Sequence, residues 1–427
     1  MSSERVTGSW RVLLAPRLWI AGAMGFASGL PLLLTLTVLQ AWLTDSGVSL
    51  TAIGFAGLVG LPYTVKFLWA PLLDRFKPLG LGRRRSWLLI FQLCLAASIA
   101  FLGVQDPRES LWLVAVAALL VAFCSASQDV VVDAYRRETL ADSEQGLGAS
   151  MYTYGYRTGM LLASAGGLIL ADVVGFRGVY LFMAAVMLSM VIMTVLAPEP
   201  ETEHGRPRTL REAFVGPFLE FFTRHGRPSG ALLVLVFIVI YKLGDNLASH
   251  MTIPFYLETG FSNTEIGAVV KAFGLASLFV GVFFGGVSTL KLGIYRALLV
   301  AGVLQGVSTL GFAALAVVGY DLGWLAAVIA FETFTQGMGL AALLAFMAYL
   351  TDTRFTAAQF ALLSALTSLP RVLLTAPTGW LASQMGWISF FVFSALVAIP
   401  GLLLLLRFRS WFPHESGAER QAVGSAP

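Results

Sequence analysis

The sequence predicts an all-α polytopic membrane protein with twelve transmembrane helices, and three observations lead to that fold class. Hydrophobic residues make up 57% of the 427 residues and charged residues only 12%, whereas soluble domains carry about 25% charged residues. The mean hydropathy is +0.79. Apolar runs of about 20 residues, long enough to cross a bilayer as a helix, recur from residue 18 to residue 409.

The apolar runs are separated by short segments that carry charges, prolines and glycines. The first run exceeds the apolar core of a signal peptide and no Ala-x-Ala-like site follows it, so we expect a retained helix. In chain order we expect spans at 18–43, 52–74, 86–105, 111–134, 147–171, 178–197, 231–256, 264–290, 295–319, 323–350, 358–383 and 387–408. The predicted domains are a six-helix bundle at 1–197, a linker at 198–230, a second six-helix bundle at 231–409 and a polar tail at 410–427.

Basic residues gather in the loops on one side of the predicted spans. The triplet Arg83–Arg85, the pair Arg136 and Arg137, and the arginines of the linker share that side, whereas the other side holds only Arg108 and Arg177. By the positive-inside rule both termini and the linker are cytoplasmic. Because these charges lie in short loops, we expect them to contact lipid headgroups rather than nucleic acid.

The two predicted halves resemble each other in sequence. Thr51-Ala-Ile-Gly54 recurs as Thr264-Glu-Ile-Gly267, 213 residues later. At an offset of 214, Asp133-Ala-Tyr135 corresponds to Met347-Ala-Tyr349, Gln145 to Gln359, and Arg157 to Arg371. Two pseudo-symmetric six-helix bundles joined by a linker are typical of a transporter that alternates access to a site between its halves.

Charged residues inside the spans are the first candidates for chemistry, because isolated charges are costly in a bilayer. We expect Asp129, Asp245 and Glu332 to be the proton-coupling candidates, with Asp129 preferred. Asp129 lies about 9 Å and Asp133 about 15 Å past the middle of the fourth span, at 1.5 Å per residue. At that depth we expect Asp133 to meet Arg75 or the Arg83–Arg85 triplet.

The candidate substrate-binding residues are cationic, amide or aromatic. Arg157 and Arg371 are repeat-equivalent and form either a two-armed anion clamp or a pair of interhelical salt bridges. Lys242 and Asp245 are three residues apart and form either a local pair or part of the transport site. The aromatic candidates are Tyr63, Tyr152 and Tyr156, whose rings either stack on sugars or pack and anchor the helices. The full set is Lys66, Arg157, Arg371, Lys242, Lys271, Gln128, Tyr63, Tyr152, Tyr156 and Gln336.

The sequence contains no pattern that indicates an enzyme. Histidine, cysteine and aspartate show no metal-ligand spacing, and no Walker A loop or nucleophile elbow is present. The only cysteines, Cys94 and Cys124, both fall in apolar runs. We therefore expect no enzyme activity, no metal and no cofactor.

The loop after the second span carries Asp74-Arg75 and then Gly82-Arg83-Arg84-Arg85. This resembles the signature of the major facilitator superfamily between helices 2 and 3, although Pro71 replaces its first glycine and the spacer is longer. The resemblance implies a cytoplasmic latch, whereas the alternative is plain positive-inside charge. The predicted gate residues are Asp74, Arg75, Arg83, Arg84 and Asp133.

Several longer stretches together resemble the AmpG family of bacterial inner-membrane muropeptide permeases. They include Gly25-Phe-Ala-Ser-Gly-Leu-Pro31, Lys66-Phe-Leu-Trp-Ala-Pro-Leu-Leu-Asp-Arg75, Cys124-Ser-Ala-Ser-Gln-Asp129 and Tyr241-Lys-Leu-Gly-Asp245. Some members have two additional spans for which this chain has no room. The resemblance implies proton-driven import of N-acetylglucosaminyl-1,6-anhydro-N-acetylmuramic acid and its peptides. It also implies roles in peptidoglycan recycling and β-lactamase induction, and a location in the inner membrane.

Two alternatives within transport stay open. A distant likeness to acetyl-CoA transporters favours another anionic solute, and a drug–proton antiporter is the second alternative, against which the cationic excess counts. A membrane sensor without transport activity would need a larger soluble module than this chain provides. The expected partners are a sugar–peptide substrate, protons and membrane lipids, and we expect a monomer.

Overall fold

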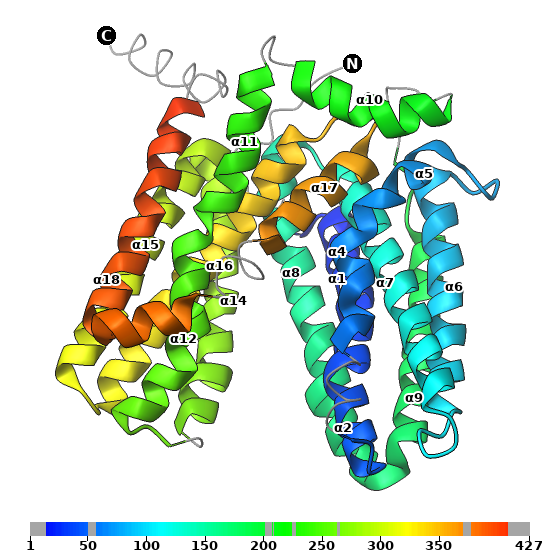
Figure 1. Ribbon diagram of the computed structural model, residues 1–427. Helices are drawn as coiled ribbons and strands as arrows, with labels where there is room; N and C mark the ends of the chain where they lie inside the picture. The colour runs from blue at the N-terminus through cyan, green and yellow to red at the C-terminus, as the bar shows by residue number, and fades with distance from the viewer. Residues whose placement is uncertain are drawn as a thin grey trace. The chain divides into compact units, whose positions relative to one another are not determined.

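The computed structural model describes residues 14–49, 57–200, 207, 209–223, 228–262, 265–369 and 377–408 (Figure 1). All regular structure in these residues is helical. The chain divides into two compact units. Unit 1 comprises Met1–Ala141, Met151–Leu219 and Thr351–Ala365, and unit 2 comprises Asp142–Ser150, Glu220–Leu350 and Leu366–Pro427. Relative to the expected halves, Asp142–Ser150 is grouped with unit 2 and Thr351–Ala365 with unit 1.

Unit 1 is built around long helices connected by short loops. The first predicted span is a continuous helical segment, Pro16–Asp45, made of α1 (Pro16–Leu33), the π-helical turn η2 (Leu34–Val38) and α2 (Leu39–Asp45). The helices that follow are α6 (Arg83–Gly103), α7 (Leu111–Thr139), α8 (Gln145–Leu161), the π-helical turn η6 (Leu162–Gly166) and α9 (Gly167–Leu196). Unit 1 also takes the first part of α17 (Thr356–Leu369).

The second predicted span is not one helix in its described part. It consists of η3 (Gly57–Gly60), α4 (Leu61–Val65), η4 (Lys66–Leu68) and α5 (Ala70–Arg75). Pro62 and Pro71 each lie at the start of a short helix, where proline is tolerated because its missing N–H has no partner in the first turn. Lys66 therefore sits at a break, where the backbone departs from regular α-helix.

Unit 2 repeats this plan with its own interruptions. Its seventh span breaks at Lys242, between α11 (Pro228–Tyr241) and α12 (Leu243–Thr259). A π-helical segment, η7 (Ile266–Phe273), leads into α14 (Gly274–Leu292). The remaining helices are α15 (Ile294–Val318), α16 (Leu322–Leu350) and α18 (Thr378–Arg407). Discontinuous helices of this kind often line binding sites in transporters.

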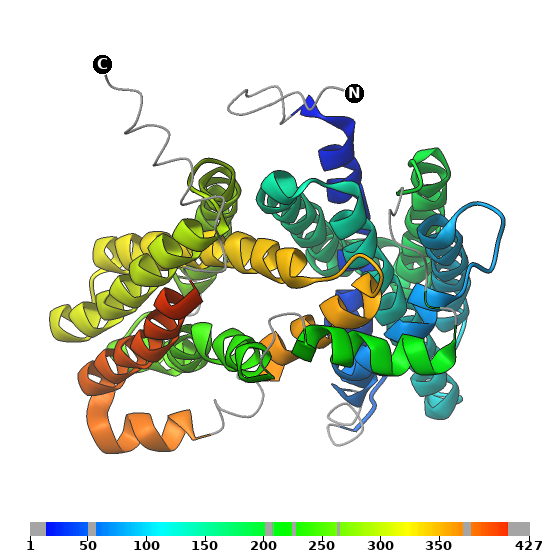
Figure 2. The same ribbon diagram turned by 90° about the horizontal axis from the view of Figure 1, so that it is seen from above.

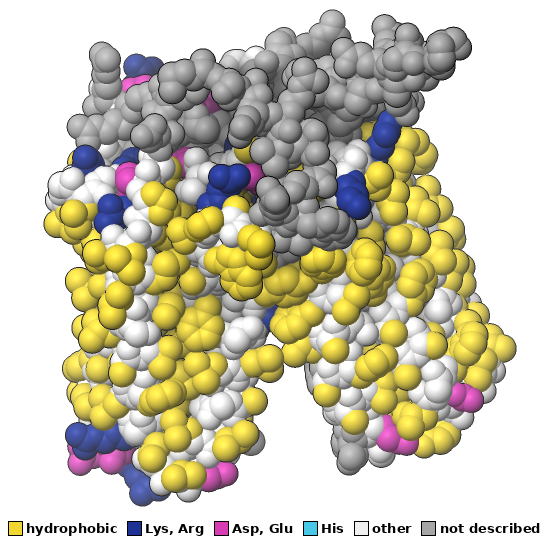
Figure 3. All heavy atoms as spheres, turned by 180° about the vertical axis from the view of Figure 1, so that it is seen from behind, with side chains coloured by type: hydrophobic (Ala, Val, Ile, Leu, Met, Phe, Trp, Pro, Cys, Tyr) yellow, Lys and Arg dark blue, Asp and Glu magenta, His cyan; other side chains and the backbone are white. Residues whose placement is uncertain are grey.

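The described residues contain nine helices that are long and apolar enough to cross a membrane, and shorter apolar helices at Leu58–Leu68 and Thr356–Thr367. One of the nine, Asp142–Leu196, runs through both the fifth and the sixth predicted spans. Gly175 breaks it with a φ of 71°, as Gly386 breaks α18 with a φ of 74°. On the face seen in Figure 3, hydrophobic side chains cover the flanks of the units and charged side chains gather toward their ends.

Most of the glycines with positive φ occur in repeat-equivalent pairs. Gly47 and Gly260 follow the first span of each half, Gly82 and Gly293 precede the third, and Gly175 and Gly386 interrupt the last hairpin. The offsets are 213, 211 and 211 residues, close to those found from short sequence matches. Left-handed backbone favours glycine, so the duplicated turns explain these pairs.

The linker contributes a short amphipathic helix, α10 (Leu210–Thr223), whose described residues up to Leu219 belong to unit 1. Figures 1 and 2 show α10 running across the end of unit 1 where Arg83–Arg85 lie, which we call the basic end. The Gln359 amide nitrogen on α17 donates to the Pro217 carbonyl oxygen at 3.0 Å, and its oxygen accepts from the Asp352 N–H at 2.8 Å. Gln359 thereby ties α10 to the start of α17.

Candidate functional site

Three ionisable side chains predicted from the sequence come together inside unit 1. Lys66, Asp129 and Asp133 are 8%, 5% and 6% exposed. The Lys66 ammonium interacts electrostatically with both carboxylates. Lys66 lies on η4, and the two aspartates lie one turn apart on α7. A buried cation thus lies close to two acids, as expected of charges that cannot reach bulk water.

Tyrosines from α4 and α8 surround this cluster. Tyr63, Tyr152 and Tyr156 each interact electrostatically with Asp129, and the rings of Tyr152 and Tyr156 lie 5.7 Å apart. Glycines on α1 let α8 come this close. A Cβ at Gly25 would lie 2.2 Å from the Tyr152 carbonyl oxygen, and one at Gly29 would lie 2.0 Å from the Tyr156 carbonyl oxygen. Small residues allow such backbone approach between membrane helices.

The same region holds buried polar atoms that lack hydrogen-bond partners within the described part of the chain. They include both amide atoms of Gln128, which is 0% exposed, and the Asp129 Oδ1 atom. The Ser28 hydroxyl interacts with the Asp129 carboxylate, and the Ser125 hydroxyl interacts with Tyr63. Buried polar groups are normally paired. The amide of Gln128 and the remaining oxygen of Asp129 are therefore suited to bind a polar substrate or water.

Arg136 is a member of this cluster that the sequence reasoning missed. Its side chain is 1% exposed and its guanidinium lies 3.8 Å from the Asp133 carboxylate. The guanidinium also lies over the rings of Tyr152 and Phe360, at 5.8 and 5.4 Å from the ring centroids. The sequence reasoning counted Arg136 among the loop charges of the positive-inside pattern, because the fourth span was predicted to end at 134. In the structure α7 continues past Arg136 to Thr139.

A second polar cluster lies in unit 2, around the break at Lys242. The Lys242 Nζ atom is 3.3 Å from both Asp245 Oδ2 and Gln305 Oε1. The Gln336 amide nitrogen lies 3.4 Å from each Asp245 carboxylate oxygen. Close by, Glu332 contacts the Ser308 hydroxyl at 2.5 Å. Helices α12, α15 and α16 supply these residues, except Lys242, which lies at the junction of α11 and α12.

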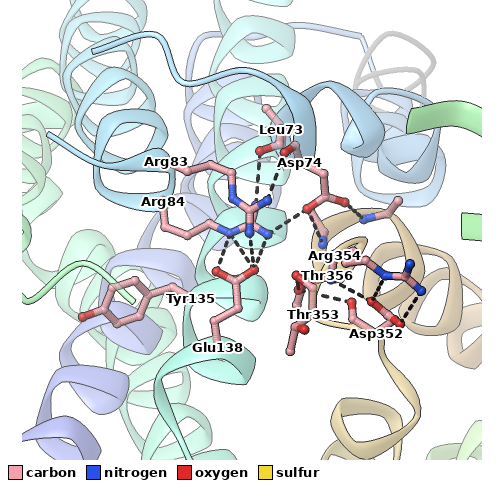
Figure 4. Close-up of polar contacts among 12 residues, drawn as sticks. Leu73, Asp74, Arg83, Arg84, Tyr135, Glu138, Asp352, Thr353, Arg354 and Thr356 are labelled. Atoms are coloured by element: carbon pink, nitrogen blue, oxygen red, sulfur yellow. Dashed lines mark hydrogen bonds and ion pairs between the residues drawn. The ribbon is translucent and has the colours of Figure 1, made fainter. Parts of the chain in front are cut away.

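The gate residues form a buried ion network at the basic end of unit 1 (Figure 4). The Arg84 guanidinium pairs with Asp74 Oδ1 at 2.7 Å and with Glu138 at 2.5 Å, and it also donates to the Leu73 carbonyl oxygen. Arg83 pairs with Glu138 at 2.9 Å and donates to the Asp74 carbonyl oxygen. The arginine side chain at 84 and both acidic side chains are at most 1% exposed.

The Asp74 carboxylate also caps the N-terminus of α17. Its Oδ1 atom accepts from the Ala357 N–H at 3.0 Å and its Oδ2 atom from the Ala358 N–H at 2.9 Å. Helix N-termini have unsatisfied N–H groups and favour negative charge. One carboxylate therefore joins the second predicted span, the Arg84 guanidinium and the start of α17.

The repeat-equivalent helix start, that of α8, lies in unit 2. Its N-terminal turn packs on α14, where a Cβ at Gly286 would lie 2.3 Å from the Ser150 hydroxyl oxygen. That hydroxyl donates to the Val282 carbonyl oxygen at 2.6 Å. Close packing and this hydrogen bond therefore contribute to the position of the start of α8.

Comparison with known proteins identifies the family. Residues 18–374 match the family model described as Major Facilitator Superfamily. The chain belongs to the major facilitator superfamily. Its relatives are permeases and transporters rather than enzymes, and the protein is a multi-pass membrane transporter of that superfamily.

Curated relatives cover nearly the whole chain. The anhydromuropeptide permease of Escherichia coli strain K12 is 44% identical over 93% of this chain and 80% of that protein. An uncharacterized protein of Haemophilus influenzae is 41% identical over 91% of this chain and 93% of that protein. The putative transporter AmpG 4 of Rickettsia conorii is 30% identical over 91% of this chain and 96% of that protein. The resemblance to the AmpG family is therefore confirmed.

Solved structures of other transporters share the fold. The transporter FucP in its outward conformation superposes with a TM-score of 0.69 at 12% identity, covering 93% of this chain and 99% of that chain. The proton:xylose symporter XylE superposes with a TM-score of 0.65 at 12% identity, covering 93% of this chain and 95% of that chain. These similarities establish the major facilitator fold of the chain.

One predicted gate residue differs in position from what its depth in the fourth span suggested. Asp133 does not meet Arg75 or the arginine triplet, because its ion-pair partner is Arg136 and it lies near Lys66. Glu138 takes the predicted place of Asp133, since α7 extends five residues beyond the predicted end of the span at 134. The Arg75 guanidinium lies 5.0 Å from the centroid of the neighbouring Phe76 ring.

The structure describes only some of the other predicted substrate-binding residues. Arg157 is half-buried and interacts electrostatically with Tyr156. Its repeat-equivalent Arg371 and the side chain of Lys271 lie outside the described residues, so the two-armed clamp stays a prediction. In the part of the chain that the structure describes, no group of three or more His, Cys, Asp or Glu side chains is arranged to hold a metal ion.

Proposed function

We propose that this protein is a proton-coupled importer of anhydro-muropeptides, the N-acetylglucosaminyl-1,6-anhydro-N-acetylmuramic acid disaccharide and its peptides, for peptidoglycan recycling. The observation that carries the proposal is the 44% identity, over 93% of this chain, to a protein named anhydromuropeptide permease. The stretches that resemble the AmpG family include two that build the cluster in unit 1, Lys66–Arg75 and Cys124–Asp129. The transporter works by alternating access.

The chemistry of the unit 1 cluster supports this class of substrate. Muropeptides combine sugar rings, which stack on aromatic faces, with amides and peptide carboxylates. Tyr63, Tyr152 and Tyr156 supply aromatic faces near Asp129, and the preceding residue, Gln128, has a buried amide without a partner among the described residues. Lys66 supplies the cation that a substrate carboxylate would pair with, and Arg157, Lys242, Lys271, Gln336 and Arg371 complete the proposed binding set.

Proton coupling is assigned to the buried acids Asp129, Asp245 and Glu332. Asp129 shares the Lys66 charge with Asp133. A substrate carboxylate that pairs with Lys66 would take that charge away from Asp129, which then favours proton binding at Asp129. Substrate and proton would thus be carried together.

The ion network around Asp74 is the proposed gate. Opening it would separate the Asp74 carboxylate from the N–H groups of Ala357 and Ala358. The expected halves at 1–197 and 231–409 would then move as two bundles around the linker. We further propose a monomer in the bacterial inner membrane with both termini in the cytoplasm, on the basis of the basic residues near Arg83–Arg85 and in the linker.

Uptake of the labelled anhydro-disaccharide and its tripeptide derivative into proteoliposomes tests the function. We expect accumulation only with an inward proton gradient, and we expect Lys66→Met to reduce it at least tenfold. Lys77→Met, at an exposed loop lysine, is the matched control and should behave as wild type. Acetyl-CoA and a cationic drug serve as competing substrates. Uptake of either in place of the muropeptide, or no uptake under any gradient, would disprove the proposal.

A further inference from the structure

Among the described residues inside unit 2, buried acids outnumber buried bases. Around the break at Lys242, the side chains of Lys242, Asp245 and Glu332 are 9%, 7% and 4% exposed. Among the described side chains there, one ammonium therefore accompanies two carboxyl groups. Two buried carboxylates with a single counter-ion are costly in a membrane interior, where an unpaired charge can instead be neutralised by binding a proton.

The hydrogen bonds indicate which acid takes the charge of Lys242. Lys242 lies 3.3 Å from Asp245 and has no comparable contact with Glu332 among the described side chains. Both Asp245 oxygens also lie within 3.4 Å of the Gln336 amide nitrogen. Three donor contacts around Asp245 fit an ionised carboxylate, which only accepts hydrogen bonds. Glu332 is therefore the neutral, protonated carboxylic acid of the two.

The surroundings of Glu332 contain few donors. The Ser308 hydroxyl has one proton and three oxygens near it: the Gln305 carbonyl oxygen at 2.9 Å, Glu332 Oε2 at 2.5 Å and Thr335 Oγ1 at 3.0 Å. Thr335 Oγ1 is 2.9 Å from its own helix carbonyl at Glu332. The Ser308 hydroxyl donates to Glu332 Oε2, a contact that the carbonyl oxygen of a carboxylic acid accepts as well as a carboxylate does.

The Asp245 carboxyl group supports the same assignment. It lies within hydrogen-bonding reach of the Glu332 carboxyl group. Two adjacent buried carboxyl groups repel each other when both are ionised, so one of them holds a proton, and the contact of Lys242 with Asp245 leaves that proton on Glu332. Tyr256 on α12 also interacts electrostatically with Glu332.

We propose that Glu332 is a proton-storage site in unit 2, protonated in the conformation described here, donating its hydrogen bond to Asp245 and accepting one from Ser308. This inference rests on the proposed proton-coupled function and names the residue of the second half that carries a proton. On release, the O–H bond of Glu332 breaks and water accepts the proton. The carboxylate that remains can then compete with Asp245 for the Lys242 ammonium, because Asp245 and Lys242 both interact electrostatically with Glu332.

Infrared spectroscopy of the full-length protein in vesicles tests the protonation directly and without transport. We expect the C=O stretch of a protonated carboxylic acid at neutral pH in the wild type and its loss in Glu332→Gln. Ser308→Ala should shift this band to higher frequency, because the carbonyl group then loses its hydrogen-bonded environment. Glu258→Gln, at an exposed glutamate of the same half, is the control and should leave the band unchanged.

Absence of the band in the wild type, or its persistence in Glu332→Gln, would overturn the assignment. The first outcome would mean that another cation neutralises Glu332, and Lys271 on η7 is the residue to examine in that case. The second outcome would place the proton on Asp245 or in the other half of the protein.

Transport measurements separate this inference from the proposed function. In Glu332→Gln we expect a loss of gradient-driven accumulation of the anhydro-disaccharide by at least tenfold, together with measurable exchange of labelled for unlabelled substrate. If the wild-type protein shows no exchange of labelled for unlabelled substrate, the proposed function is contradicted. Accumulation by Glu332→Gln at the wild-type level, with wild-type exchange present, would contradict only the proton-storage role.

Discussion

Asp74 and Arg84 form an ion pair of 2.7 Å that is sealed from solvent, and the same Asp74 carboxylate caps the first N–H groups of α17. The two functions share one side chain. Anything that turns the carboxylate away from Arg84 also uncaps the helix, because both Asp74 oxygens already accept helix N–H groups. The position of α17 in unit 1 is therefore coupled to the charge network around Glu138.

Asp74→Asn should weaken this network without changing the shape of the side chain. The amide keeps one acceptor oxygen, so one helix N–H and the Arg84 guanidinium lose their charged partner. Breaking a buried ion pair typically costs about 3 kcal/mol. We expect a lower temperature of unfolding in detergent and slower substrate uptake, measured against Glu109→Gln at an exposed loop position. An unchanged unfolding temperature would show that the network does not stabilise the fold.

Gly82→Ala should destabilise the start of α6. Gly82 has a φ of 104°, and a Cβ there would lie 2.2 Å from the Glu199 carboxyl carbon. Glu199 accepts from the N–H groups of Arg84 and Arg85 at 2.8 and 2.9 Å, so the methyl group would displace this cap. Left-handed backbone alone costs about 1–2 kcal/mol for a residue with a Cβ. Thermal unfolding of Gly82→Ala should show the loss.

Gly80→Ala is the matched control for that substitution. Gly80 lies two residues away in the same loop and is not one of the described glycines with a positive φ. No atom lies within 4 Å of the position that an added methyl group would take. We expect Gly80→Ala to unfold at the wild-type temperature. Equal destabilisation by both substitutions would argue against a specific role for the Glu199 cap.

Gly155→Ala should separate α8 from α1. A Cβ at Gly155 would lie 1.8 Å from the Gly22 carbonyl oxygen and 2.7 Å from the Phe26 nitrogen. Both neighbours are backbone atoms and cannot rotate away, so overpacking should cost about 1–3 kcal/mol. Since α8 carries Tyr152 and Tyr156, we expect weaker substrate binding as well as lower stability. Gly267→Ala is the control, because the added methyl group would have open space around it. It should leave substrate binding and the unfolding temperature unchanged.

Asp129→Asn should uncouple transport from the proton gradient. The neutral amide cannot bind a proton, and among the described residues Lys66 keeps Asp133 as its nearby acid. We expect gradient-driven accumulation to fall at least tenfold while the protein still folds and binds substrate, as measured by uptake, size-exclusion profile and a binding titration. Accumulation at the wild-type level would move the coupling role in unit 1 away from Asp129 and onto Asp245 and Glu332.

The membrane class was predictable because it depends on hydropathy along the chain, and the major facilitator fold because the loop after the second span resembles the signature of that superfamily. The same loop motif suggested a gating role for Asp74 and the arginine triplet, but not which arginine pairs with Asp74. Other relationships depend on where each helix ends and which way its side chains point. The fourth span was predicted to end at 134, whereas α7 continues to Thr139, so Glu138 rather than Asp133 reaches the arginines.

The interruptions of helices were harder to predict than the helices themselves. Residues 52–74 read as one apolar span, yet the described part is broken near Lys66 into short helical pieces. Hydropathy does not register such a break, because the residues on both sides are equally apolar. The grouping of Lys242, Gln305 and Glu332 also joins helices far apart in sequence, which no local pattern reveals.

The cap on α17 has a consequence for inhibitor design. Its two N–H groups, at Ala357 and Ala358, belong to the main chain and are present whatever side chains those positions carry. A small carboxylate compound that competes with Asp74 for them would bind atoms that point mutations cannot delete, except by introducing proline. A cell could therefore not easily become resistant to such a compound by changing the residues that the compound contacts.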